Sequence, residues 1–194
     1  MADTQFSAVY NRFLGKITDD LYLELTPEDT LKDLQNLLLD AIPGFEFPRH
    51  NLYDYTIEVR EMGEDELTPD DFVLGTVWGN VEDDILLEIP NVLVDKSRFN
   101  IELSPEEINI LALLMKQGWV QRQVTSIENT RMKYSGSDFK MTSQANHLSK
   151  LLTLLDESRR DSFHMQRLYK RRKFADGGYK SNWSSLMETS ALDD

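Results

Sequence analysis

The sequence contains no cysteine, so neither disulfide bonds nor thiolate chemistry can contribute to its stability or function. No stretch approaches the ~18 consecutive apolar residues of a membrane-spanning helix, and residues 1–13 contain no apolar signal core. We therefore expect a soluble, non-secreted protein that makes no contact with a membrane and folds in a reducing compartment.

Motifs of several enzyme classes are also missing. The nine glycines form neither a Walker-type phosphate loop nor a dinucleotide-binding fingerprint, and residues 135–137 lack the surroundings of a nucleophile elbow. The acidic clusters at 64–66, 70–71 and 82–84 lack the ordered spacing of a calcium loop. The histidines are scattered rather than paired as on a metal-binding helix, and they are His50, His147 and His164. The sequence therefore predicts a protein that is not an enzyme and that uses no metal or cofactor.

Basic residues are scarce in the first half of the chain. Residues 1–103 hold 7 Lys and Arg against 23 Asp and Glu, whereas residues 104–175 hold 13 against 7. Residues 176–194 are acidic again, with 1 against 4. This asymmetry predicts an acidic half, a basic arm and a distinct tail. An acidic surface also disfavours tight nonspecific binding of DNA by the whole molecule.

Three segments carry the signal of a helix start, in which a hydroxyl residue is followed by proline and then by acids. They begin at Thr26, Thr68 and Ser104. Apolar residues at helical spacing predict helices over residues 4–17, after Thr26 as far as Pro43, and over residues 105–134. A further long helix should start between Asp138 and Ser143 and continue to Tyr169.

Residues 45–103 follow a different pattern, with many acids and with strand-like runs at 53–59 and 85–89. The predicted fold class is therefore mainly α with a small β element. It comprises N-terminal helices, a β-containing acidic insertion, a long C-terminal helical hairpin and an extended C-terminal tail. We assign residues 1–175 to one helical domain, with 45–103 as its loop-rich insertion, and residues 176–194 to the tail.

The polar stretch at 135–152, which lies between two strongly apolar helical segments, is a candidate site. Gly136 can adopt positive φ, and Ser137 or Asp138 can cap the next helix, which favours a plain joint. Phe139 could anchor this joint on the helix pair. We assign the stretch to a helix joint or an interface, and its candidate residues are Asp138, Phe139, Lys140, Gln144, Asn146 and His147.

A basic segment marks the end of the last predicted helix. Its cations are Arg167, Lys170, Arg171, Arg172 and Lys173. Several of them would share one helical face, which could meet DNA phosphates together. Cations also gather at helix C-termini because the helix dipole favours them there, and they could equally meet the acidic half of a neighbouring copy. The segment is therefore either an intersubunit patch or a patch close to DNA.

Two stretches of the chain resemble a known family. The stretches LTPEDTLKDLQNLLLDAIPGFEFPR at 25–49 and LSPEEINILALLMKQGWVQRQVTSIENTRMKYSGSDFKMTSQANHLSKLL at 103–152 resemble the head-to-tail connector proteins of tailed bacteriophages, also called portal adaptor, neck or head-completion proteins. The resemblance covers residues 4–60 and 99–173. The acidic insertion at 61–98 departs from it and leaves the tail-facing surface undefined.

The resemblance implies a structural virion protein at the head–tail junction, assembled in the host cytoplasm. Copies of the chain, twelve by the family pattern, would form a ring beneath the portal protein and would also contact further neck or tail proteins. DNA would pass through the channel without specific binding. In such proteins a C-terminal extension docks on the portal, and by position this role would belong to Tyr179, Trp183, Leu186 and Met187.

Two other functions remain open from the residues alone. The chain could be a DNA-binding regulatory or packaging subunit that grips DNA with the basic helix end. It could also be a host-interaction protein whose acidic half mimics DNA. The first predicts a salt-sensitive DNA affinity that requires the basic segment, and the second predicts competition with DNA for a basic enzyme.

Overall fold

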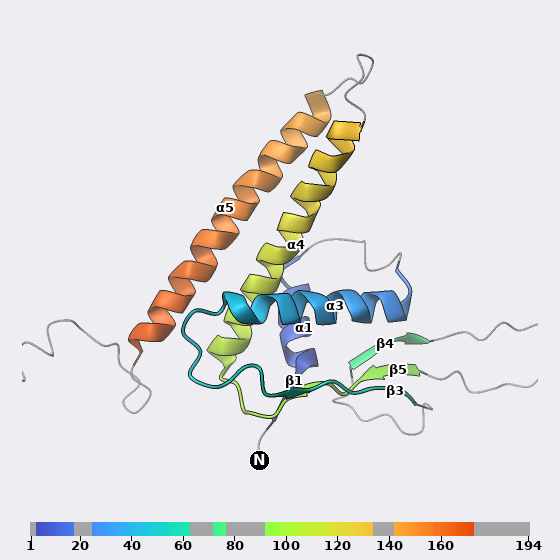
Figure 1. Ribbon diagram of the computed structural model, residues 1–194, viewed down its shortest axis with the longest axis vertical. Coiled ribbons are helices and arrows are strands. Elements are labelled where there is room, and N and C mark those ends of the chain that lie inside the picture. Colours follow the sequence, from blue (N-terminus) through green and yellow to red (C-terminus); the bar gives the residue numbers. More distant parts are fainter. Residues whose placement is uncertain (1–2, 18–24, 63–71, 77–91, 134–141, 173–194) are drawn as a thin grey trace, which may run out of the picture.

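The structure, a computed structural model, describes residues 3–17, 25–62, 72–76, 92–133 and 142–172 (Figure 1). Within these residues the protein is mainly helical with small antiparallel sheets, as the sequence predicts. The helices are α1 (Phe6–Leu14), α3 (Pro27–Ala41), α4 (Pro105–Lys133) and α5 (Thr142–Arg171), and a 3-10 turn, η1 (Ile42–Gly44), follows α3. The strands are β1 (Thr4–Gln5), β2 (Tyr55–Thr56), β3 (Val59–Met62), β4 (Phe72–Thr76), β5 (Val92–Asp95) and β6 (Arg98–Phe99).

The first helix is shorter than the predicted 4–17. Thr4 and Gln5 pair with Phe99 and Arg98 as a strand, and the helix begins only at Phe6. The pairing removes these two residues from the helix because β6 lies beside them, which local sequence does not reveal. Within α1 the predicted apolar stripe is correct, since its buried side chains include Phe6, Val9, Tyr10 and Phe13.

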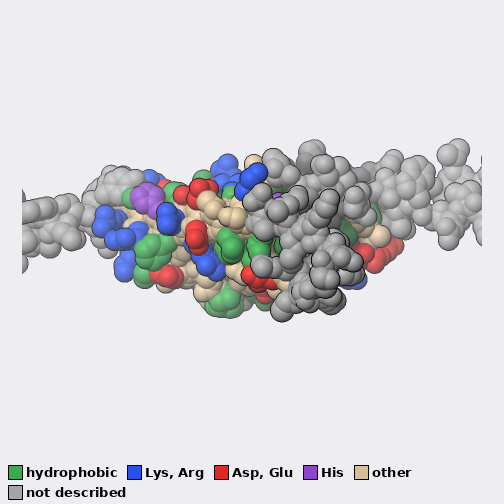
Figure 2. Space-filling model, turned by 90° about the horizontal axis from the view of Figure 1, so that it is seen from above, with side chains coloured by type: hydrophobic (Ala, Val, Ile, Leu, Met, Phe, Trp, Pro, Cys, Tyr) green, Lys and Arg blue, Asp and Glu red, His purple; other side chains and the backbone are tan. Residues whose placement is uncertain are grey.

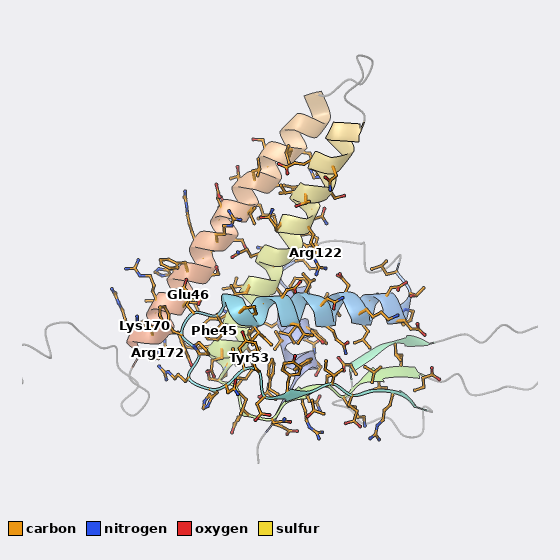
Figure 3. All side chains as sticks on the ribbon, viewed as in Figure 1. Phe45, Glu46, Tyr53, Arg122, Lys170 and Arg172 are labelled. Carbon is orange, nitrogen blue, oxygen red and sulfur yellow. The ribbon has the colours of Figure 1, made fainter. Side chains whose placement is uncertain are left out.

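Helix α3 forms as the sequence predicts. The Thr26 side chain accepts a hydrogen bond from the Asp29 backbone N–H at 3.2 Å, and Pro27 occupies the first helical position. Its predicted apolar stripe is buried at Leu31, Leu34, Leu38 and, one turn further, Ile42. Arg122 of α4 binds Asp33 at 2.5 Å and Asp40 at 3.3 Å, which ties the polar side of α3 to α4 (Figure 3).

Helices α4 and α5 lie side by side and run antiparallel (Figure 1). Arg159 donates to Gln121 at 3.0 Å, and Ser162 donates to Gln117 at 3.3 Å. Later residues of α5 therefore contact earlier residues of α4, as expected of antiparallel helices. The start of α5 at Thr142 falls within the predicted interval. Residues 134–141, which separate the two helices, lie outside the described residues.

The strands form two antiparallel sheets, in the orders β1-β6-β2 and β3-β5-β4. The predicted strand at 53–59 is split between β2 and β3, and the one at 85–89 lies outside the described residues. The helix-start signal at Thr68 is not followed by a helix over residues 72–76, which form β4, in keeping with the β element expected in this insertion. Its β-prone residues pair with β5, and this pairing overrides the local signal of Thr68 and Pro69.

The main core lies where α1, α3, the first half of α4 and the β1-β6-β2 sheet meet. It includes Phe45 and Phe99 from the predicted insertion, packed with Leu111 and Met115 of α4. A second, smaller cluster of Val124, Leu148 and Leu151 joins α4 to the start of α5. The outer half of α4 and the facing part of α5 thus project from the main core as an arm (Figure 1).

Candidate interaction site

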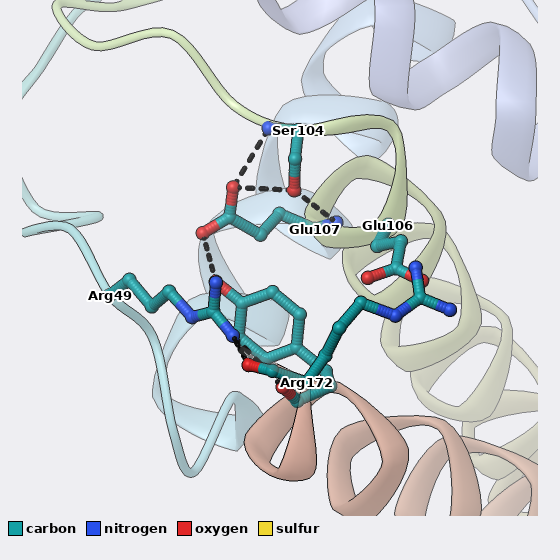
Figure 4. A network of polar contacts seen from close by, with 6 residues as sticks. Arg49, Ser104, Glu106, Glu107 and Arg172 are labelled. Atoms are coloured by element: carbon teal, nitrogen blue, oxygen red, sulfur yellow. Dashed lines mark hydrogen bonds and ion pairs between the residues drawn. The ribbon is translucent and has the colours of Figure 1, made fainter. Parts of the chain in front are cut away.

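The C-terminal end of α5 is held by a polar network whose starting point is the first turn of α4 (Figure 4). Ser104 caps α4 and forms a capping box with Glu107. The Ser104 backbone N–H and hydroxyl each donate to Glu107 Oε2 at 2.8 Å, and the Glu107 N–H donates to the Ser104 hydroxyl at 3.3 Å. These bonds fix the orientation of a carboxylate that is only 1% exposed.

The second oxygen of this carboxylate receives the hydroxyl of Tyr169. Tyr169 donates to Glu107 Oε1 at 2.5 Å, and both side chains are buried. Burial raises the pKa of Tyr169 well above its ordinary value of 10.0, and the hydrogen bond to Glu107 raises this pKa further. The phenol therefore stays protonated and remains a donor to Glu107 at neutral pH.

Arg49 caps the C-terminal end of α5 by binding its last carbonyl groups. Its Nη2 donates to the carbonyl oxygen of Tyr169 at 3.1 Å and to that of Arg172 at 2.7 Å. The guanidinium also lies over the Tyr169 ring, 4.5 Å from its centroid. The last carbonyls of a helix have no partner within the helix and carry the negative end of its dipole, so a cation stabilises them. Arg172 itself forms an ion pair with Glu106.

The segment between α3 and β2 completes this arrangement (Figure 3). The Glu46 N–H donates to Gln166 Oε1 at 2.8 Å, and Gln166 Nε2 donates to the Gly44 carbonyl at 3.3 Å. Lys170 Nζ lies 4.0 Å from the centroid of the Phe47 ring. We call residues 44–49 together with Glu107 the α5 clasp, because they hold the last turns of α5 against the main core.

The outer face of α5 carries a second arrangement. Arg160, His164, Arg167 and Arg171 lie three to four residues apart and are all exposed, so they form one stripe. Phe163, which is 48% exposed, lies within it, and the Arg167 guanidinium is 5.5 Å from its ring centroid. In the part of the chain that the structure describes, none of the three arginines forms an ion pair.

The predicted site residues fall into four groups. Arg167 and Arg171 lie on the outer stripe, whereas Lys170 and Arg172 contact Phe47 and Glu106. His147 is exposed near the start of α5, and Gln144 and Asn146 belong to that helix. The remaining predicted site residues lie outside the described residues, and they are Asp138, Phe139, Lys140, Lys173, Tyr179, Trp183, Leu186 and Met187.

The sequence analysis did not identify the α5 clasp or the place of Phe163 within the outer stripe of α5. The Ser104–Glu107 capping box could have been found, because its serine and glutamate have the required spacing of three residues. No local signal connects Arg49 with Tyr169, which is 120 residues further along the chain. The stripe could have been extended back to Arg160 by following the same helical face.

Among the described residues, no group of three or more His, Asp or Glu side chains is placed to hold a metal ion. No helix in the described ranges is long and apolar enough to cross a membrane. Comparisons of the chain with models of protein families, with curated proteins and with solved structures find no match.

Proposed function

We propose that the protein is a structural virion subunit that forms a ring beneath the portal of a tailed bacteriophage and joins the head to the tail. In this proposal DNA passes through the ring without specific binding, and further neck or tail proteins attach below it. The protein has no catalytic turnover and no cofactor. The finer architecture also belongs to the proposal: a hairpin closed by residues 134–141 and an extended tail over residues 176–194.

The observation that carries the proposal is the α5 clasp. A tail that docks on a partner needs a rigid origin, because ordering a loosely attached tail costs conformational entropy on binding. The clasp supplies such an origin, since Arg49, Glu107 and the Glu46 backbone N–H bind the last turns of α5 directly before residue 173. The tail then offers Tyr179, Trp183, Leu186 and Met187 as anchors, and aromatic anchors dominate many interfaces.

The test is a truncation of the chain after Asp176. The truncated chain should unfold at the same temperature as the full chain, because the core and the clasp are retained, but it should no longer bind the assembled portal of the same phage. Mass photometry of portal mixed with either chain measures the number of copies bound. Binding of the truncated chain at full strength would contradict the docking role of the tail.

A matched pair of tail variants sharpens this test. Replacing Tyr179 and Trp183 with Ala removes two anchors, whereas replacing Ser181 and Ser184 with Ala changes neighbouring positions without removing apolar area. The aromatic pair should weaken portal binding by about tenfold or more, in line with interface hot spots. Equal effects of the two pairs would argue against specific anchors.

The alternative function is DNA binding through the basic end of α5. Its support is the outer stripe, where Arg160, Arg167 and Arg171 are exposed. It predicts that the triple replacement of Arg171, Arg172 and Lys173 with Ala removes a salt-sensitive affinity for duplex DNA. The ion pair of Arg172 with Glu106 weakens this alternative, because it engages one of the three cations within the chain. Fluorescence anisotropy with labelled duplex DNA decides the matter.

A further inference from the structure

One end of the molecule carries exposed cations around an aromatic ring. We define the α5 patch as Arg160, Phe163, Arg167 and Arg171. Figure 2 shows Lys and Arg side chains gathered at this end of the molecule. Exposed arginines beside an aromatic side chain are typical of protein interfaces, where Arg and Phe are enriched. The patch therefore has the composition of a contact for an apolar surface that also carries acids.

Strands β2 and β3, which follow one another along the chain, each lie at the edge of a sheet. Tyr55 pairs with Phe99 in β2, and Val59 pairs with Asp95 in β3. The register continues between them, since the Lys96 N–H donates to the Glu58 carbonyl at 2.8 Å. Among the described strands, none pairs with the opposite edge of β2 or β3.

This edge also carries an unusual amount of exposed apolar surface. Of the five large apolar side chains exposed in the described part of the chain, three lie within seven residues here: Tyr53 at 66%, Ile57 at 50% and Val59 at 40%. Glu61 follows them, exposed and without an ion pair among the described residues. We define the edge patch as Ile57, Val59 and Glu61.

The two patches lie at opposite ends of the molecule. Figure 1 shows the C-terminal end of α5 on one side and β3 on the other, with the main core between them. At the end opposite the gathered cations, Figure 2 shows a cluster of Asp and Glu. One copy cannot bring its two patches together, so a contact between the α5 patch and the edge patch has to join two copies.

We infer that the α5 patch of one copy binds the edge patch of the next copy. Phe163 covers Ile57 and Val59, and the arginines of the α5 patch meet Glu61. Burial of Phe163, Ile57 and Val59 supplies affinity. The opposite charges of the two patches set the orientation and disfavour contacts between two α5 patches or between two edge patches. Such a contact joins two different surfaces, so it repeats from copy to copy and closes into a ring when the rotation allows.

The inference deepens the proposed function by naming the contact between subunits, and it rests on that function for the closed ring. The composition of the α5 patch also favours a second copy of the chain over DNA as its binding partner. The outer surface of duplex DNA offers phosphates to the arginines, but its stacked bases leave little apolar surface for Phe163. A second copy of the chain offers the apolar side chains Ile57 and Val59 together with the acidic Glu61, and its residues 1–103 are strongly acidic.

Cysteine cross-linking tests the contact directly, because the chain contains no native cysteine. The variants Phe163→Cys and Ile57→Cys are mixed and treated with a short bismaleimide. The reaction is run once with the two chains alone at high concentration and once with the assembled portal added. Cross-linked dimers should form in the mixture and not in either variant alone. Leu152→Cys replaces Phe163→Cys in the control, because Leu152 is also exposed on α5 but lies outside the patch.

A charge exchange provides an independent readout of the same contact. Arg167→Glu alone and Glu61→Arg alone should each weaken self-association at least about tenfold, as measured by sedimentation velocity or by copies bound per portal. An equal mixture of the two variants should recover most of the loss, because every contact in an alternating assembly then pairs opposite charges.

The outcomes separate this inference from the proposed function. Portal binding by the wild type without a Phe163–Ile57 cross-link would overturn the inference and leave the function standing. The cross-link in free chains that never bind portal would support the inference and contradict the function. Cross-links of Phe163→Cys with itself, or duplex DNA binding that Arg167→Glu abolishes without any cross-link, would overturn the inference.

Discussion

At the scale of single residues, Tyr169 connects three parts of the chain that lie far apart in the sequence. Its hydroxyl binds Glu107 at the start of α4, its carbonyl accepts from Arg49, and its ring packs against Phe45 with centroids 5.6 Å apart. Glu107 would remain buried without this donor, and a buried charge that loses a partner is costly. Tyr169 is therefore the residue on which we expect the α5 clasp to depend most.

Replacing Tyr169 with Phe should lower the free energy of unfolding by about 2 kcal/mol at neutral pH, since hydrogen bonds to charged groups contribute about 1.5–3 kcal/mol. The pH dependence should also change. The folded-state pKa of Tyr169 lies above its unfolded value of 10.0, so its contribution is complete below pH 10 and is lost as the pH rises further. Above pH 10 the free energy of unfolding should fall less steeply with pH in the variant than in the wild type. Urea unfolding at a series of pH values measures this difference.

Two features make this prediction specific. Burial and Asp95 also raise the pKa of Tyr10, so part of the decline above pH 10 should persist in the Tyr169→Phe variant. Tyr53→Phe serves as the matched control, because Tyr53 is 66% exposed and lies outside the clasp. It should change the free energy of unfolding at neutral pH by no more than about 0.5 kcal/mol. Identical pH profiles for wild type and Tyr169→Phe would show that the hydroxyl does not stabilise the fold.

At the scale of elements, α4 is the scaffold of the molecule. It contacts α1, α3 and α5, and its first half is buried on several sides, with Ile110, Leu111, Ala112, Leu114 and Met115 all in the core. Its helical backbone nevertheless includes Gly118, which costs conformational entropy on folding. A Cβ at this position would lie 3.5 Å from Leu37 Cδ2, which is an ordinary van der Waals distance.

Gly118→Ala should therefore raise the free energy of unfolding by about 0.5–1 kcal/mol. Thermal or urea unfolding followed by circular dichroism measures the change. Gly44→Ala is the matched contrast, because a Cβ there would lie only 3.3 Å from Leu114 Cδ2 and would crowd the core at the α5 clasp. Gly44→Ala should not stabilise the protein. A loss of stability in Gly118→Ala would indicate that α3 and α4 pack more tightly than this distance implies.

At the scale of the whole molecule, the fold has a well-packed core and a thinner arm. The main core draws side chains from α1, α3, α4, α5 and the strands, whereas among the described side chains the cluster in the arm consists of Val124, Leu148 and Leu151 with two partly buried neighbours. Local stability follows the amount of buried apolar contact. The arm should therefore open more readily than the core, although α4 runs through both.

Hydrogen exchange should reveal this gradient within one helix. Amides of residues 110–115 should exchange only by global unfolding, while those of residues 121–129 should exchange faster through local opening of the arm. Val124→Ala should increase exchange in the second region and leave the first nearly unchanged, because Val124 belongs to the smaller cluster. Uniform protection along α4 would contradict the division into core and arm.

The sequence by itself determined most of the helices. Residues such as Thr26 with Pro27, and Ser104 with Pro105, encode helix starts locally, and apolar residues at helical spacing encode the buried faces of α3 and α4. These signals suffice because capping and amphipathic periodicity act within a few residues. The charge division between the halves of the chain was likewise readable, and with it the basic character of the end of α5.

Only the tertiary structure decided which distant segments meet. The strand at Thr4 and Gln5 exists because β6 lies beside it, and β4 forms after the helix-start signal at Thr68 because β5 pairs with it. The α5 clasp joins Arg49 to Tyr169 across 120 residues, and the free edge at Ile57 and Val59 depends on what the rest of the chain leaves uncovered. Such features follow from long-range pairing and packing, whose partners no local pattern specifies.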